Sequence, residues 1–144
     1  MVNTKDYSLS KILGLNMKVT YLWEGAESTL SPSCKTETVN SDGFSLLSCL
    51  LMDDGGIPYS QTIPWIEEGV MKVDSVLSGK AVSSSWARES WGVLITLDVA
   101  KIYSIHDETY FEELTLQQFR NALVSWEAFL EAKPNTSEQK TIEL

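Results

Sequence analysis

The sequence predicts an α+β fold in which an antiparallel β-meander packs against a few α-helices, one of them an amphipathic helix near the carboxyl terminus. Apolar and polar residues alternate in short segments between residues 80 and 114, and the breaks between these segments are short enough for hairpins. Apolar residues then recur at helical spacing within residues 115–132. A chain of 144 residues has the size of one domain, which we expect to span residues 1–132, with residues 133–144 as a mobile tail.

The amino-terminal part of the chain contains one clear strand pattern. Residues 17–23 alternate between apolar and polar side chains and end at Glu24-Gly25, which predicts a strand, and we expect a short helix before it at residues 8–15. Residues 28–43 are rich in Ser, Thr, Pro and Asn and predict a long loop or irregular edge. Residues 44–52 form a nearly continuous apolar run whose length favours a buried strand, although periodicity alone leaves a helix open.

A turn and a helix are predicted before the meander. The turn is Asp53–Gly56, because glycines supply the positive φ angles that tight turns require. Pro64 suits the first turn of a helix, where its missing N–H donor is not needed, and Gly79 suits the position after the helix ends. Four apolar residues share one face of this helix: Ile66, Val70, Val73 and Leu77. The strands of the meander are expected at residues 82–86, 91–97, 101–105 and 109–114.

The last helix has the most distinct signals. Thr115 and Gln118 fit a capping box, in which each side chain accepts a hydrogen bond from a free amide of the first turn. Its apolar residues step by three and four: Leu116, Phe119, Leu123, Trp126 and Leu130. We expect this face to pack on the sheet, so that Trp126, Phe129 and Leu130 belong to the core.

The chain is strongly acidic, with 20 acidic residues against 11 basic ones and a formal net charge of −9. This charge repels phosphate groups, so we expect no direct binding of nucleic acid or of an anionic membrane surface. Two stretches, residues 42–74 and 98–113, carry an excess of acids that together equals the whole net charge. If they meet in the fold, they form an acidic face suited to a basic partner; the alternative is that the acidity only keeps the protein soluble.

The sequence favours a cytoplasmic location. The first residues lack the basic start and apolar run of a secretory signal, and no stretch has the roughly 20 apolar residues that span a membrane. The two cysteines, Cys34 and Cys49, do not imply a disulfide framework, although one bridge is compatible with their number. We therefore expect free thiols.

The residues that most catalytic and metal sites need are missing. His106 is the only histidine, and we expect it on the surface beside two acids. The chain has no Gly-x-Ser-x-Gly elbow, no glycine-rich phosphate loop and no Cys-x-x-Cys pair, so we predict no catalytic triad, metal site or cofactor. The turn Asp53–Gly56 resembles half of a calcium loop but lacks the alternating ligands and the terminal Glu.

Pairs of adjacent carboxylates keep one enzymatic alternative open, a small carboxylate-dependent hydrolase. The pairs are Asp53-Asp54, Glu67-Glu68, Asp107-Glu108 and Glu112-Glu113. Adjacent side chains point apart on a helix and to opposite faces of a strand, so neither arrangement brings the two carboxylates of a pair together. The sequence therefore favours a binding protein over an enzyme.

Five segments from residue 63 onwards carry a resemblance to a known family. They are Ile63–Gly69, Trp91–Ile95, Val99–Ile105, Glu112–Phe119 and Ala122–Leu130. The resemblance covers the chain from about residue 60 to its end, as strands followed by a capped helix with a Trp-x-x-Phe-Leu ending. In this order the segments resemble small bacterial immunity proteins, the inhibitors encoded beside polymorphic toxins, including those of contact-dependent growth inhibition systems.

The resemblance implies an inhibitor that binds a toxin domain tightly and either covers its active site or blocks its substrate. Many such toxins are nucleases with basic clefts, so the implied partner is a basic nuclease domain bound by one copy of this chain, and an acidic inhibitor would imitate the phosphate backbone. The residues expected at the interface are carboxylates beside aromatic anchors: Asp53, Asp54, Tyr59, Trp65, Glu67, Glu68, Asp107 and Glu108. A generic adaptor with a peptide groove is the remaining alternative.

Overall fold

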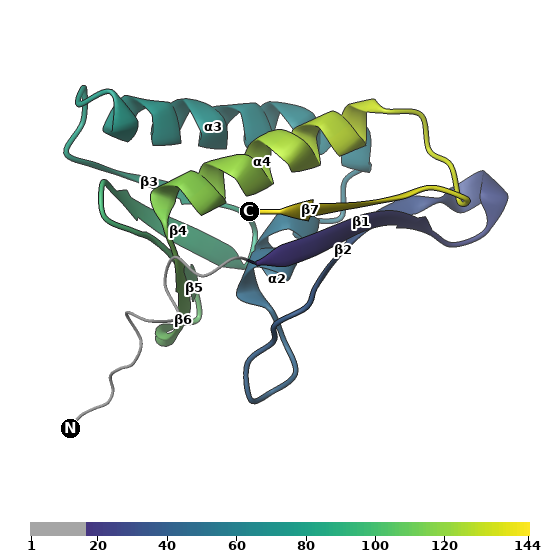
Figure 1. Ribbon diagram of the computed structural model, residues 1–144, viewed down its shortest axis with the longest axis horizontal. Helices are drawn as coiled ribbons and strands as arrows, with labels where there is room; N and C mark the ends of the chain where they lie inside the picture. The colour runs from purple at the N-terminus through teal and green to yellow at the C-terminus, as the bar shows by residue number, and fades with distance from the viewer. Residues whose placement is uncertain (1–16) are drawn as a thin grey trace.

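A computed structural model describes residues 17–144 of the chain, so the helix expected at residues 8–15 lies outside the described part (Figure 1). The α+β prediction is confirmed: the described residues form three α-helices, two short 3-10 helices and two antiparallel sheets. The helices are α2 (Leu46–Met52), α3 (Ile63–Leu77) and α4 (Leu116–Glu131), with η1 (Glu27–Thr29) and η2 (Tyr59–Thr62). The strands are β1 (Lys18–Glu24), β2 (Ser31–Thr36), β3 (Ser83–Ala87), β4 (Trp91–Thr96), β5 (Ala100–Ser104), β6 (Asp107–Leu114) and β7 (Gln139–Glu143).

The predicted meander is present as a four-stranded sheet in the order β3-β4-β5-β6. Neighbouring strands are antiparallel, with Val93 of β4 opposite Ile102 of β5. The side chains of Val93, Ile95 and Ile102 are fully buried, as the alternating pattern requires of the face turned to the core. This sheet therefore follows from local sequence signals.

The last helix also forms as predicted. Thr115 Oγ1 accepts from the Gln118 amide at 3.0 Å, and Gln118 Oε1 accepts from the Thr115 amide at 3.1 Å. The helix packs on β1, where the Tyr21 ring lies 5.1 Å from that of Trp126 and the Tyr21 hydroxyl donates to the Ala122 carbonyl at 3.2 Å. Trp126, Phe129 and Leu130 belong to the core, as expected.

The prediction of a buried strand at residues 44–52 was wrong, because this run forms α2. Ser45 caps the helix by accepting from the Ser48 amide at 3.2 Å, and Glu112 Oε1 accepts from the Leu46 amide at 3.0 Å. The helix contacts β2 of one sheet and β4, β5 and β6 of the other. A helix buried between two sheets is apolar on more than one side, which explains why the run looked continuous.

Two segments predicted to lack regular structure form strands beside β1. Within the loop expected at residues 28–43, β2 pairs with β1, and its Cys34 is buried against the core. The expected tail after residue 132 contains β7, which pairs with the other edge of β1; Thr20 and Thr141 hydroxyls lie 2.9 Å apart. Both strands have few apolar residues, so their order depends on pairing with β1 and, for β2, also on packing against α2.

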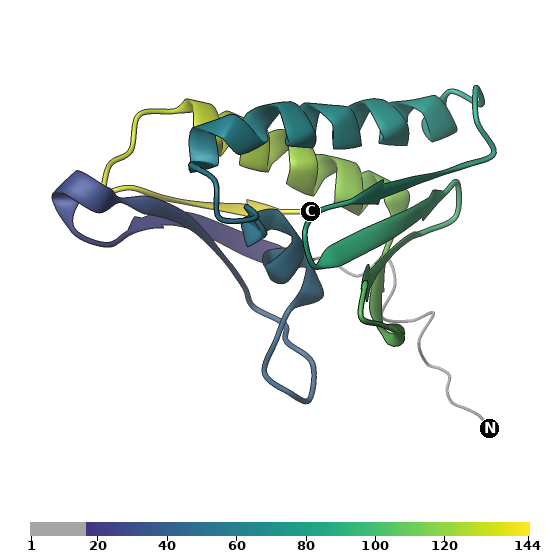
Figure 2. The same ribbon diagram turned by 180° about the vertical axis from the view of Figure 1, so that it is seen from behind.

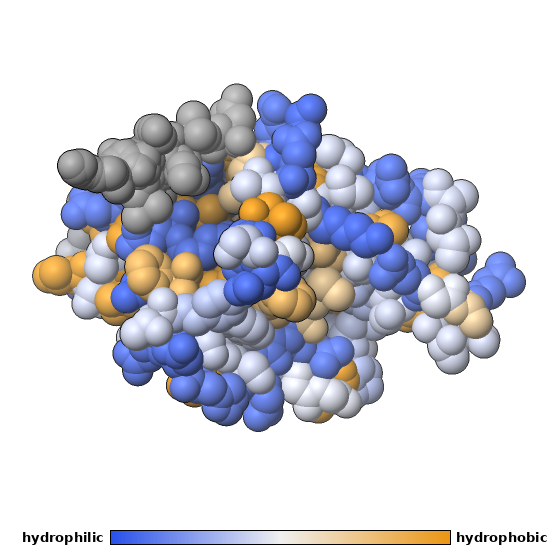
Figure 3. Space-filling model, turned by 90° about the horizontal axis from the view of Figure 1, so that it is seen from below, coloured by the Kyte–Doolittle hydropathy of each residue, from blue (hydrophilic) through white to orange (hydrophobic). Residues whose placement is uncertain are grey.

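The two views of the ribbon show how these parts are layered. Helices α3 and α4 lie side by side over the sheets, and α2 fills the space between the sheets on the other side (Figures 1 and 2). Seen from the side opposite α3 and α4, apolar residues are interspersed among hydrophilic ones (Figure 3). Within residues 17–144, none of the helices combines the length and the apolarity that crossing a bilayer requires.

Candidate binding surface

The turn Asp53–Gly56 connects α2 to η2, and the structure confirms it as a turn. Gly55 and Gly56 have φ angles of 62° and 84°. Asp54 Oδ1 accepts from the Gly56 amide at 2.8 Å, which closes the turn locally. Asp53 Oδ2 accepts from the Ser90 amide at 2.7 Å, so this carboxylate joins the end of α2 to the turn between β3 and β4.

Arg88 lies at the centre of this junction. The residue is only 7% exposed, and its guanidinium carbon lies 5.3 Å from the ring centroid of Trp65 and 5.6 Å from that of Trp86. Its Nη1 donates to the Leu50 carbonyl at 3.1 Å, while Nε and Nη2 have no hydrogen-bond partner in the described chain. Burial lowers the pKa of Arg88 to about 10, and the charges of Asp53 and Asp54 oppose that shift.

Trp65 lies in the first turn of α3 and is half-buried. A Cβ atom added to Gly55 would lie 3.6 Å from Trp65 Cη2 and 3.5 Å from Glu89 Oε1. The turn, the indole ring and the Glu89 carboxylate are therefore immediate neighbours. Arg88 and Glu89 lie in the break between the strands predicted at residues 82–86 and 91–97, and no local signal in the sequence indicates that they meet Trp65.

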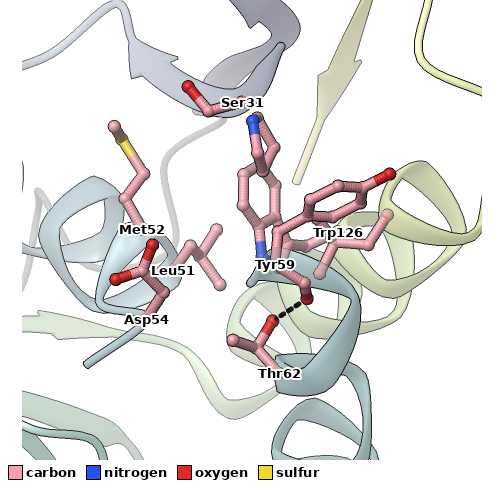
Figure 4. Close-up of a pocket in the computed structure, with 9 residues that line it drawn as sticks. Ser31, Leu51, Met52, Asp54, Tyr59, Thr62 and Trp126 are labelled. Carbon is pink, nitrogen blue, oxygen red and sulfur yellow. Dashed lines mark hydrogen bonds between the residues drawn. The ribbon is translucent and has the colours of Figure 1, made fainter. Parts of the chain in front are cut away.

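Tyr59 and Asp54 line a small pocket of about 150 Å³ between β2, α2, η2 and α4. Leu51, Met52 and Asp54 lie on one side of it, opposite Tyr59 and Trp126 (Figure 4). The Tyr59 ring is fixed edge-on to Trp23, with centroids 5.0 Å apart, and its carbonyl accepts from the Thr62 hydroxyl at 2.6 Å. The Tyr59 ring is therefore held in place on the side of the pocket that faces Asp54.

Three carboxylates gather where the start of α3 meets the end of α4. One oxygen of each of Glu67, Glu127 and Glu131 lies within 4.8 Å of the others. Partial burial and the nearby charges of Glu67 and Glu131 raise the pKa of Glu127. Oxygen ligands of this kind suit a hard cation or a cationic side chain. Glu127 and Glu131 were not singled out in the sequence, because their proximity to Glu67 depends on the packing of α4 against α3.

The predicted interface residues fall into two separate places. Six of them belong to the segment from the end of α2 to the first turns of α3. We use the name acidic end for the carboxylates of this segment and their neighbours: Asp53, Asp54 and Glu89 at the Asp53–Gly56 turn, and Glu67, Glu68, Glu127 and Glu131 near the start of α3 and the end of α4. Trp65 and Glu89 both lie beside Gly55, Tyr59 lines the same pocket as Asp54, and Lys72 Nζ lies 3.9 Å from Glu68 Oε2. Asp107 and Glu108 lie instead at the tip of the β5–β6 hairpin, away from the start of α3 (Figures 1 and 2).

The carboxylates predicted at the interface therefore do not all lie on one face, although the stretches 42–74 and 98–113 touch where Glu112 accepts from the Leu46 amide. Asp107 is held locally, because its Oδ1 accepts from the Thr109 amide at 3.0 Å, and hydrogen bonds from the Thr109 hydroxyl and amide lower its pKa. Glu112 points inward to α2, where burial raises its pKa. Asp74 is neutralised by Arg120, whose Nε lies 2.6 Å from Asp74 Oδ1.

The remaining chemistry-bearing residues lie elsewhere. Cys34 and Cys49 are free thiols, as expected, and burial raises the pKa of Cys34 to about 11, which makes its thiol unreactive. His106 is exposed. Glu67 and Glu127 are the kind of carboxylate pair across two elements that a hydrolase uses, but they lie on a helical surface and do not line the Tyr59 pocket.

Comparisons with protein-family models, with curated proteins and with solved structures found no match to this chain.

Proposed function

We propose that this protein is an immunity protein that binds a cognate toxin domain, a basic nuclease, and neutralises it by covering the active site or substrate cleft with the acidic end. One copy of the chain, acting in the cytoplasm, binds one toxin domain. The inhibitor works by occupancy and needs no catalytic group, metal or cofactor of its own.

The observation that carries this proposal is the gathering of Glu67, Glu127 and Glu131. Like charges this close repel one another, and the raised pKa of Glu127 reflects in part that repulsion. A cationic partner relieves the repulsion when it binds, so part of the binding energy is stored in the free protein. Complementary charge also steers the two proteins together and speeds their association.

The aromatic residues beside the carboxylates supply the second element of a tight interface. Trp65 and Tyr59 are half-buried and fixed by their neighbours, so they lose little freedom on binding. A hydrolase would need its paired carboxylates inside a pocket that encloses the substrate. Glu67 and Glu127 lie outside the Tyr59 pocket, and we therefore prefer binding to catalysis.

The test is neutralisation of the toxic domain encoded immediately upstream of this gene. Cells that express that domain should survive when this protein is co-expressed, and the purified proteins should bind with a submicromolar Kd. The double variant Glu67→Lys/Glu127→Lys should lose both rescue and binding. Glu138→Lys is the matched control, since Glu138 is exposed in the loop before β7. An upstream product that is neither toxic nor bound would overturn the proposal.

A further inference from the structure

We propose that Trp65 and the carboxylates around it anchor one arginine side chain of the partner, and that buried Arg88 is the positioning residue for this anchor. The anchor, which we call the Trp65 corner, consists of Trp65 and Glu89, which both lie beside Gly55, and of Arg88 with the carboxylates whose charges act on it, Asp53 and Asp54. The identity of the partner rests on the proposed function, whereas the chemistry of the corner stands on its own geometry.

Arg88 is in an unusual state for a buried cation. A buried guanidinium normally pairs with a carboxylate, because an unpaired buried charge is costly. Arg88 instead has two nitrogens without hydrogen-bond partners in the described chain and lies between two indole rings. A buried charge with unpaired donors lowers stability, and such local losses of stability are expected at functional sites.

Arg88 holds three elements of the fold together. It joins the last turn of α2 through the Leu50 carbonyl, α3 through Trp65 and β3 through Trp86. Trp86 cannot shift freely, because a Cβ atom at Gly69 of α3 would already approach its ring to 3.0 Å. The inner side of Trp65 is thus fixed, and its exposed part keeps one orientation toward solvent.

The charge around the exposed part of Trp65 is negative. Asp54 Oδ1 is occupied by the Gly56 amide, Oδ2 has no hydrogen-bond partner among residues 17–144, and Glu89 is exposed with Oε1 beside Gly55. Three carboxylates against the single charge of Arg88 make the corner net negative. A planar guanidinium stacks on an indole and donates two parallel hydrogen bonds to carboxylates, so arginine fits this set better than lysine.

The test uses the full chain and a tetra-arginine peptide, with tetra-lysine and the uncharged tetra-citrulline as matched peptides. Binding is followed by the indole N–H signals in nuclear magnetic resonance spectra, with the Trp65 signal assigned from its loss in Trp65→Phe. Tetra-arginine should shift the Trp65 signal most among the indoles, and tetra-citrulline should leave it unchanged. The double variant Asp54→Asn/Glu89→Gln should weaken binding about tenfold, in line with the loss of charge-assisted hydrogen bonds. Glu138→Gln should bind as the wild type does.

Arg88→Met separates a positioning role from a merely electrostatic one. Removing a positive charge from the corner would by itself tighten tetra-arginine binding. If Arg88 positions Trp65, the variant instead binds more weakly, while urea unfolding shows a folded protein. Tighter binding by Arg88→Met would overturn the positioning role. An unmoved Trp65 signal, or equal shifts with tetra-lysine, would overturn the arginine anchor.

The two proposals fail in different ways. If the peptide shifts Trp65 but no upstream toxin is neutralised, the immunity role falls and the arginine anchor stands. If the toxin is neutralised by the wild type and equally well by Asp54→Asn/Glu89→Gln, the anchor falls and the immunity role stands.

Discussion

At the scale of single residues, the least expected features are two ionisable groups drawn into the interior, Arg88 and Glu112. Each binds the free backbone groups at one end of α2: Glu112 accepts from the Leu46 amide, and Arg88 donates to the Leu50 carbonyl. Opposite charges at these ends also match the dipole of the helix, negative at its start and positive at its end. A helix of only seven residues is thereby held at both ends.

Glu112→Gln should leave the protein at least as stable as the wild type at pH 7. Burial raises the pKa of Glu112, so the folded state binds its proton more tightly than the unfolded state does. Glu112 therefore contributes to stability below its ordinary pKa, and this contribution is lost as pH rises through the raised pKa. As pH falls from 7 to 4, the free energy of unfolding of the wild type should rise relative to that of Glu112→Gln. Urea unfolding measures this difference.

Glu112→Ala should behave differently from Glu112→Gln, because it leaves the Leu46 amide without its acceptor. We expect a loss of about 1–3 kcal/mol in the free energy of unfolding. A Glu112→Gln variant as unstable as Glu112→Ala at neutral pH would contradict the account of this residue as a backbone acceptor whose ionised form carries a burial cost.

At the scale of elements, helices and strands are locked together by a few close contacts that local sequence does not reveal. Helix α3 lies so near β3 that Gly69 touches the face of Trp86, and Lys72 Nζ donates to the Ser85 carbonyl at 2.6 Å. Strand β1 lies between β2 and β7 and brings residues from both ends of the described chain together. Such contacts decide which helix residues must be small.

Gly69→Ala should destabilise the protein although alanine is the better helix former. The added Cβ would lie 3.0 Å from two atoms of the Trp86 ring, and that ring is buried against Arg88 and Phe119. Overpacking of this kind costs about 1–3 kcal/mol, which outweighs a gain in helix propensity of about 1 kcal/mol. A thermal unfolding curve shifted to higher temperature would contradict this packing.

Removing residues 137–144 should lower the free energy of unfolding by about 2 kcal/mol or more. The deletion removes β7, exposes an edge of β1 and breaks the bond from the Leu144 amide to the Met17 carbonyl at 2.8 Å. The measurement is urea unfolding, with Glu138→Gln as the control. A truncated protein as stable as the full chain would indicate a dispensable tail and not a strand of the sheet.

At the scale of the whole molecule, charge is distributed unevenly over the fold. The acidic end combines carboxylates from α3, α4 and two turns, whereas Asp74 is paired with Arg120 farther along the same helices. This arrangement concentrates negative electrostatic potential at one end of the molecule. Screening by salt should therefore slow association with a basic partner much more than it changes the dissociation rate.

Binding of the proposed toxin partner should weaken as pH falls from 7 toward 5. Because its pKa is raised, Glu127 takes up a proton at a higher pH than an ordinary glutamate does. This uptake reduces the negative charge of the acidic end. A cationic partner favours the ionised form, so affinity increases with pH through the raised pKa. Calorimetry across this range should show a weaker pH dependence for Glu127→Gln, and an identical dependence would exclude Glu127 from the interface.

The sequence by itself determined the α+β class, the meander, the capped last helix and the Asp53–Gly56 turn, because periodicity, capping and glycine act over a few neighbouring residues. Tertiary structure decided that residues 46–52 form a helix and that β2 and β7 join β1, since these depend on what surrounds them. It also separated Asp107 and Glu108 from the acidic end and added Glu89, Glu127 and Glu131 to it. Charge acts through space, so its grouping follows the packing of α3, α4 and the turns and not the order of residues along the chain.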